Sequence, residues 1–267
     1  MRYLREAYKI LLGAALGILV VFPTYLAGEE TTLWNIADVL SLGNADTGFG
    51  SSIQILEGMI PFLLFQIMYG VYLYRHYTTA CVYYFTRYTR RGVWYLRESL
   101  GLLIRTVLYC LLYYLAAMGF LAATVGINTE AGDAWMACQA WLTTALYLFT
   151  MTMLMNLLAI QFGGTVGYFA GIILQVLLIA SLGLCNEILA LPPEEMANPG
   201  LEEALWRWNP ISQLVGKWHT EISIQNEMAP LNYECSITIL IVLICLVLWF
   251  GGVIVKKKEI IANDMEE

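Results

Sequence analysis

Residues 237–255 read ITILIVLICLVLWFGGVIV and are followed at 256–258 by three lysines. A helix crosses a bilayer core with about 20 mostly apolar residues, and this stretch has that length without a charged side chain. The whole chain has the same character, because 59% of its 267 residues are apolar and 13% are charged. Soluble domains are about 25% charged. The sequence therefore predicts an integral membrane protein and excludes a water-soluble globular domain.

Five further apolar runs of similar length precede this one. We expect an all-α integral membrane protein with six transmembrane helices, at 8–27, 53–74, 102–123, 135–160, 166–184 and 237–255. The spans then form one transmembrane domain over 1–267. The last outer connection, 185–236, contains the proline-led starts and turns typical of short helices, so we expect short helices there.

The Lys and Arg residues set the expected orientation. Of the 14, 12 lie at the N-terminus, in or beside the connection between the second and third spans, and at the C-terminus. Cytoplasmic flanks carry the excess of Lys and Arg, so we expect both termini on the cytoplasmic side of the plasma membrane. By the same division, 14 of the 21 acidic residues lie outside. The net charge of −7 thus hides a basic inner face that suits anionic lipid headgroups, and nucleic acid is not an expected partner.

Motifs of common catalytic and cofactor sites are missing from the sequence. It contains no GxxxxGK[ST], GxSxG, HExxH or CxxC string, which argues against ATP hydrolysis, zinc or haem in this chain. The string at 202–207, EEALWR, fits the EExxxR pattern of intramembrane CAAX-type proteases, but the FxxxH pattern of that family is missing. We therefore expect no enzyme activity and no cofactor or metal here.

Small and polar residues within the spans predict close helix packing. Glycines or other small residues spaced four apart let helix backbones approach each other in lipid. The helix-packing positions we expect are Gly13, Gly17, Gly163, Gly167 and Gly171. Among the few polar residues, we expect Asn156 and Gln175 to bond neighbouring helices, and the Arg105 side chain to extend to the interface.

Cys185 and Cys235 are expected at the outer ends of the fifth and sixth spans. A disulfide between them could close the long outer connection if the helix ends are adjacent. The alternative is a pair of unpaired thiols, and it is the one we expect.

The inner connection at 76–98 is too polar to span and too apolar to be a loose linker. Tyrosine, phenylalanine and tryptophan alternate in it with arginine. These residue types are enriched at protein interfaces, but they also suit a helix lying among lipid headgroups. The residues alone leave both interpretations open.

This layout resembles the membrane subunit of ABC transporters of the export-type (type-2) permease class. The resemblance is found mainly in the stretch FTRYTRRGVWYLR at 85–97, with Tyr88 where that family usually has proline and Arg97 where it has lysine. A second point of resemblance is WNPIS at 208–212. The acid-x-x-x-Gly pair common just upstream in the family is missing here.

The resemblance implies a six-span permease subunit without its own ATPase domain. Segment 76–98 would be a coupling segment docked on a nucleotide-binding ATPase subunit, which would hold the ATP and Mg. A second permease subunit, the same or related, would complete the assembly, which would export an amphipathic or peptide-like substrate, an antimicrobial peptide or a drug. The alternative is a membrane scaffold, sensor or immunity subunit that binds a partner through 83–97. The coupling residues implied are Tyr84, Phe85, Arg87, Tyr88, Arg90 and Arg91.

Overall fold

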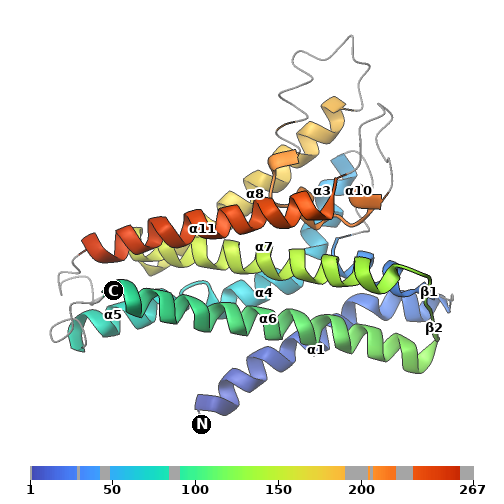
Figure 1. Cartoon of the computed structure of the whole chain (residues 1–267), viewed down its shortest axis with the longest axis horizontal. Helices are drawn as coiled ribbons and strands as arrows, with labels where there is room; N and C mark the ends of the chain where they lie inside the picture. The colour runs from blue at the N-terminus through green and yellow to red at the C-terminus, as the bar shows by residue number, and fades with distance from the viewer. Residues whose placement is uncertain are drawn as a thin grey trace.

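The computed structural model describes residues 2–28, 31–42, 49–83, 91–189, 204, 207–220 and 231–258, and this part of the chain is mostly helical (Figure 1). Five helices within it are long and apolar enough to cross a membrane. They are α1 (Arg2–Ala27), α6 (Arg91–Thr124), α7 (Asp133–Phe162), α8 (Gly164–Leu189) and α11 (Tyr233–Lys257). Their number and composition indicate a membrane-embedded protein.

The second predicted span, 53–74, does not form one helix. It is divided among α3 (Phe49–Gly58), α4 (Ile60–Tyr69) and α5 (Tyr72–Tyr83). Pro61 lies in the first turn of α4, where its missing N–H is tolerated. The other interruption, at residues 70–71, has its physical cause in α7, as described below. A single transmembrane helix over 53–74 is therefore not confirmed.

Five short elements complete the described fold. α2 (Leu33–Leu40) begins at Thr32, whose hydroxyl accepts a hydrogen bond from the Asn35 N–H at 3.1 Å. β1 (Thr31–Thr32) and β2 (Ile127–Asn128) pair in parallel and join the loops after α1 and α6. η2 (Ser212–Leu214) and α10 (Lys217–Thr220) are short helices before α11.

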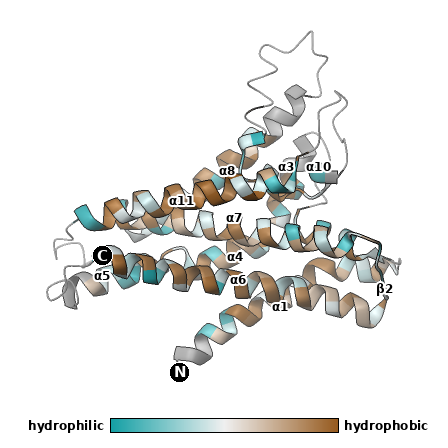
Figure 2. Cartoon of the chain, viewed as in Figure 1, coloured by the Kyte–Doolittle hydropathy of each residue, from teal (hydrophilic) through white to brown (hydrophobic). Residues whose placement is uncertain are grey.

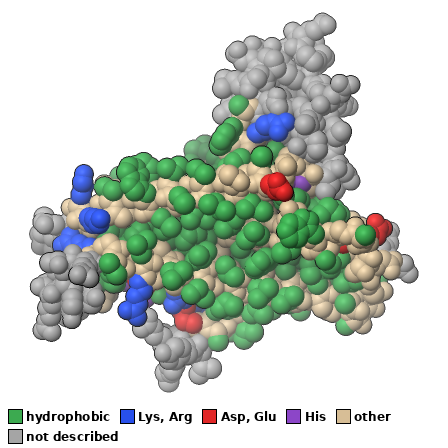
Figure 3. Space-filling view, viewed as in Figure 1, with side chains coloured by type: hydrophobic (Ala, Val, Ile, Leu, Met, Phe, Trp, Pro, Cys, Tyr) green, Lys and Arg blue, Asp and Glu red, His purple; other side chains and the backbone are tan. Residues whose placement is uncertain are grey.

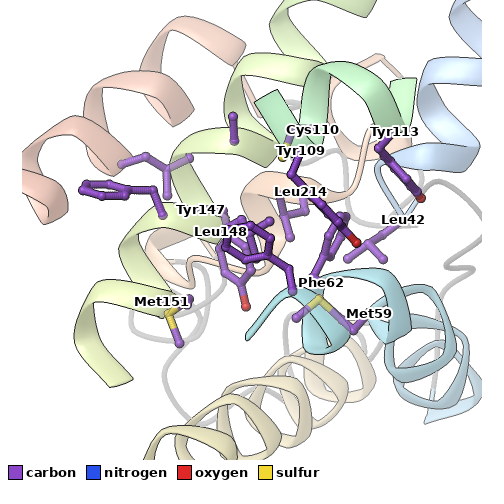
Figure 4. Packing of buried hydrophobic residues seen from close by; sticks show 14 of the residues in the cluster. Leu42, Met59, Phe62, Tyr109, Cys110, Tyr113, Tyr147, Leu148, Met151 and Leu214 are labelled. Carbon is purple, nitrogen blue, oxygen red and sulfur yellow. The ribbon is translucent and has the colours of Figure 1, made fainter. Parts of the chain in front are cut away.

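α7 is the central helix of the bundle. In its most apolar stretch 72% of residues are buried, against 11% in that of α11, and α7 packs on α6, α8, α11 and α2. Burial on most sides is typical of a helix inside a bundle, and Figure 2 shows apolar residues interspersed with more polar ones along the face of α7 in view. Figure 4 shows part of this core, where Phe62, Tyr109 and Tyr147 lie between helices. The bundle is thus organised around α7, with α11 on its surface (Figure 1).

Four of the five glycines singled out lie at close helix contacts. A Cβ at Gly13 would come within 2.9 Å of Tyr109, and one at Gly17 would overlap the Tyr113 carbonyl, so both glycines lie against α6. Gly167 and Gly171 lie against α7 in the same way.

Gly163 departs from that expectation. It has open space around it and a φ of +95°, a conformation that favours glycine. It forms the turn between α7 and α8 and packs against no neighbouring helix.

The described charges gather at the ends of the bundle. In Figure 3 the visible Lys and Arg side chains lie mostly at one end, with apolar side chains along the length. The carbonyl oxygen of Lys258 accepts hydrogen bonds from the Tyr77 hydroxyl at 2.8 Å and from Arg91 Nη1 at 3.2 Å. Lys258 Nζ donates to the Gln161 carbonyl at 2.5 Å. The end of α11 therefore joins α5, α6 and the end of α7.

Candidate functional site: the break between α4 and α5

The Asn156 side chain of α7 is inserted into the backbone between α4 and α5. Its Oδ1 accepts a hydrogen bond from the Leu73 N–H at 2.6 Å, and its Nδ2 donates to the Tyr69 carbonyl at 2.9 Å. In a continuous helix the N–H of residue 73 would donate to the carbonyl of residue 69. The amide thus replaces one helical hydrogen bond by two, which is a recognised cause of a helix break. Asn156 is fully buried.

This arrangement would satisfy the backbone of a helix break inside a membrane. Lipid provides no hydrogen bonds, so irregular backbone persists there only where protein groups satisfy it. Asn156 lies six residues before the end of α7, which places the break roughly 9 Å from that end. The expectation that Asn156 bonds a neighbouring helix is confirmed.

A pair of buried amides lies one turn before the break. Gln66 Nε2 donates to Gln175 Oε1 at 3.2 Å, and Gln175 Nε2 donates to Gln66 Oε1 at 2.8 Å. The Tyr147 hydroxyl also donates to Gln175 Oε1, at 3.4 Å. α8 is thereby joined to α4 and α7, and the expected helix-to-helix bond of Gln175 is confirmed.

An ion pair between Glu6 and Arg105 joins α1 and α6 beside the break. Glu6 Oε2 accepts from Arg105 Nε at 3.0 Å and from the Tyr69 hydroxyl at 3.1 Å. Lys9 Nζ donates to the other oxygen, Oε1, at 3.0 Å. Arg105 therefore lies in a partly exposed ion pair, and the expectation that its side chain extends to the interface stays a prediction.

Glu98 of α6 holds the first turn of α5. Its Oε2 contacts His76 Nδ1 at 2.9 Å and accepts a hydrogen bond from the Tyr72 hydroxyl at 3.4 Å. The Arg105 guanidinium lies over the Tyr72 ring, 4.6 Å from its centroid. Tyr69 and Tyr72, on either side of the break, are thus held by separate carboxylates.

We call these residues the break cluster. Its side chains come from α1, α4, α5, α6, α7 and α8, so a rearrangement at the break changes contacts with all of them. Among the described residues no group of three His, Cys, Asp or Glu side chains could hold a metal. The site joins helices through hydrogen bonds and ion pairs. The members are Glu6, Gln66, Tyr69, Tyr72, His76, Glu98, Arg105, Asn156 and Gln175.

The coupling residues implied by the resemblance lie beside the break cluster in sequence. Arg91 is the first residue of α6 and bonds Lys258. The other five, Tyr84, Phe85, Arg87, Tyr88 and Arg90, lie outside the described residues. In the predicted cysteine pair, Cys235 is a free, exposed thiol, and the Cys185 side chain lies outside the described part.

Sequence reasoning missed most of the break cluster. Glu6 and Glu98 lie near the ends of apolar runs and read as interfacial charges. A usable signal was Gly70 within the second run, between two tyrosines. Glycine favours interruption over helix continuation, but it does not say which side chain fills the gap.

Comparison of the chain with protein-family models, with curated proteins and with solved structures finds no match.

Proposed function

We propose that this chain is a permease subunit of an ATP-driven exporter in the plasma membrane, with both termini cytoplasmic. It would lack an ATPase domain of its own and move an amphipathic or peptide-like substrate or a drug outward. A separate nucleotide-binding subunit would bind ATP and Mg, and a second permease subunit would pair with this one. The observation that carries the proposal is the direct connection of α5 and α6 to the α4–α5 break.

α5 and α6 form two arms that are held together. α6 has 34 residues, or roughly 51 Å of helix, so it exceeds a hydrocarbon core of about 30 Å. The rings of Tyr77 and Trp94 lie 5.9 Å apart, and His76 contacts Glu98 at 2.9 Å. These two side-chain contacts join α5 to the first part of α6.

A displacement of the connection at 84–90 would reach the break through these arms. Tyr72 begins α5 and bonds Glu98 of α6, so both arms contact the break cluster. The break is a natural bending point, since its backbone is held by one side-chain amide in place of a continuous helical ladder. Closure of a docked ATPase would thereby change the angle between α4 and α5 and move the surrounding helices.

A scaffold, sensor or immunity subunit is the second candidate. The saturated pairing within the break cluster favours it, because the Gln66–Gln175 amide pair and the Glu6–Arg105 ion pair need no ligand. A rigid helix-joining cluster would serve a static protein equally well. The two candidates differ in whether an ATPase binds the coupling segment.

Affinity purification with mass spectrometry tests the proposal. The wild-type chain should co-purify an ATPase, and Arg87→Glu or Arg90→Glu should reduce its recovery at least tenfold while membrane insertion is unchanged. Lys257→Glu is the matched control, because it reverses an exposed charge at the same end of the bundle. An absence of any ATPase with wild type, or equal recovery with all variants, would refute docking at this segment and favour the scaffold.

A further inference from the structure

The end of the bundle where α11 finishes, here called the lysine end, holds cations without counterions. Arg97, Lys256 and Lys257 are exposed, and their side chains form no ion pair or hydrogen bond with other described residues. The two described carboxylates in this half of the bundle, those of Glu6 and Glu98, are occupied by their own ion pairs. An anion that neutralises these cations must therefore come from outside the described residues.

α6 and α11 approach each other closely at the lysine end. A Cβ at Gly92 would lie 3.1 Å from Lys256 Cε, so the lysine stem lies against the α6 backbone. Further along α6, the Tyr95 hydroxyl lies against Gly251 and donates to the Val247 carbonyl at 3.5 Å. The lack of a side chain at both glycines lets the two helices meet here.

Exposed apolar residues lie on both helices beside this contact. Val93 and Leu96 of α6 are 64% and 57% exposed, and Trp249 of α11 is 64% exposed. A Cβ at Gly252 would meet no other atom, so α11 is open one turn beyond Trp249. In Figure 3 the Lys and Arg side chains at this end border apolar side chains. Lipid tails are as apolar as these side chains, so an acyl chain can cover them.

Arg97 and Lys256 extend toward the same level of the membrane from opposite directions. Helical side chains tilt toward the N-terminus of their own helix. α6 begins at the lysine end and α11 finishes there, so Arg97 tilts toward this end and Lys256 tilts away from it. Arg97 follows Gly92 by five residues, or roughly 7.5 Å of helix. Long Lys and Arg stems cover such distances along apolar surface, which allows both charges to reach one phosphate.

We propose that Arg97 and Lys256 together bind the headgroup phosphate of an anionic phospholipid. Its acyl chain lies along the exposed surface of Val93, Leu96 and Trp249. The guanidinium donates parallel hydrogen bonds to the phosphate oxygens, and the ammonium binds as a point charge. Cations without a neutralising acid favour a lipid of net negative charge over a zwitterionic one. The site requires only a membrane-embedded bundle and does not rest on the transport proposal.

The expected preference follows from the two charges. A Lys or Arg near an anionic lipid surface contributes a factor of about five in affinity. Phosphatidylglycerol should therefore bind about 25-fold more tightly than phosphatidylcholine. Native mass spectrometry of the purified full chain in a neutral detergent measures the Kd of the first bound lipid. Glycerol phosphate, which has the same phosphate but no acyl chain, should not displace phosphatidylglycerol at equal concentration.

Two variants locate the site. Arg97→Gln and Lys256→Gln should each weaken phosphatidylglycerol binding about fivefold, and the double variant about 25-fold. Their affinity for phosphatidylcholine should stay unchanged, which separates loss of the charges from misfolding. Arg97→Lys keeps the charge and should lose less affinity than Arg97→Gln.

Lys257→Gln is the matched control. Lys256 contacts α6, and Lys258 Nζ bonds the Gln161 carbonyl at the end of α7. Consecutive residues point about 100° apart around a helix, so Lys257 faces away from both helices, and its variant should bind as wild type does.

Four results would overturn the site. They are a wild-type preference below the roughly fivefold effect of one charge, an unchanged affinity of the double variant, and displacement of the lipid by glycerol phosphate. The fourth is an equal loss with Lys257→Gln and Lys256→Gln, because it would show diffuse attraction to the whole lysine end.

Discussion

The inserted amide at the α4–α5 break predicts the outcome of Asn156→Leu. Leucine has a similar volume but neither accepts from the Leu73 N–H nor donates to the Tyr69 carbonyl. These two backbone groups are four residues apart and are the natural partners of an α-helix. We therefore expect the break to close into one helix from α4 through α5 in this variant.

The magnitude depends on whether closure occurs. If the break stayed open, two backbone groups would lose their partners at about 1–3 kcal/mol each, and the free energy of unfolding would fall by roughly 2–6 kcal/mol. If it closes, one backbone bond replaces two side-chain bonds, each worth about 0.6 kcal/mol on average in a membrane protein. The free energy of unfolding is then expected to fall by about 1 kcal/mol or less. The contacts of Tyr72 would be lost as well.

Two measurements check this prediction. Spin labels at the exposed positions Ile60 and Thr79 should move to about 28 Å apart, the rise of a continuous helix over 19 residues. The free energy of unfolding in micelles gives the second value. The control is Thr152→Val, because the Thr152 hydroxyl bonds only the Leu148 carbonyl of its own helix.

Either of two results would refute the reasoning. A loss of several kcal/mol with unchanged label distance would mean that the break persists without Asn156. A stability and a label distance equal to those of Thr152→Val would mean that the amide has no influence on the break.

Two other changes test the helix contacts. Gly17→Ala should lower the free energy of unfolding by about 1–3 kcal/mol, because the new Cβ would overlap a carbonyl of α6. Thermal unfolding checks this against Gly119→Ala, which has open space and should be neutral or stabilising by up to about 1 kcal/mol; equal losses would contradict the close contact. Arg105→Met should destabilise the chain by about 1–2 kcal/mol, since it leaves Glu6 with fewer partners in a partly exposed site. Arg97→Met on the exposed side of α6 should change unfolding by less than about 0.5 kcal/mol, and a loss equal to that of Arg105→Met would argue against the ion pair.

Five of the predicted spans could be located because a helix buried in lipid must be apolar along nearly its whole length. At 237–255 no polar residue but Thr238 interrupts the apolar stretch, and the helix found there extends it by a few residues at each end. The same requirement allowed Asn156 and Gln175 to be identified as bonding residues, since a polar side chain in a span needs a partner.

The second span could not be predicted in the same way. Hydropathy reports only whether a segment is apolar, and 53–74 is apolar throughout. Whether its backbone continues depends on the acceptor of the Leu73 N–H. This N–H donates either to the Tyr69 carbonyl, as in a continuous helix, or to the Asn156 amide, which lies 87 residues beyond Tyr69. Likewise, Glu6 and Arg105 lie 99 residues apart, and no local pattern marks them as a pair.

By itself the sequence determined that this protein is membrane-embedded, mostly helical and basic at one end, because these properties are sums over local composition. Only the tertiary structure decided where the second apolar run bends and which carboxylate holds each tyrosine beside the bend. Each of these depends on the distance between side chains that are remote in sequence. Hydrogen bonds form only within about 3 Å, and the packing around α7 brings those side chains within that distance.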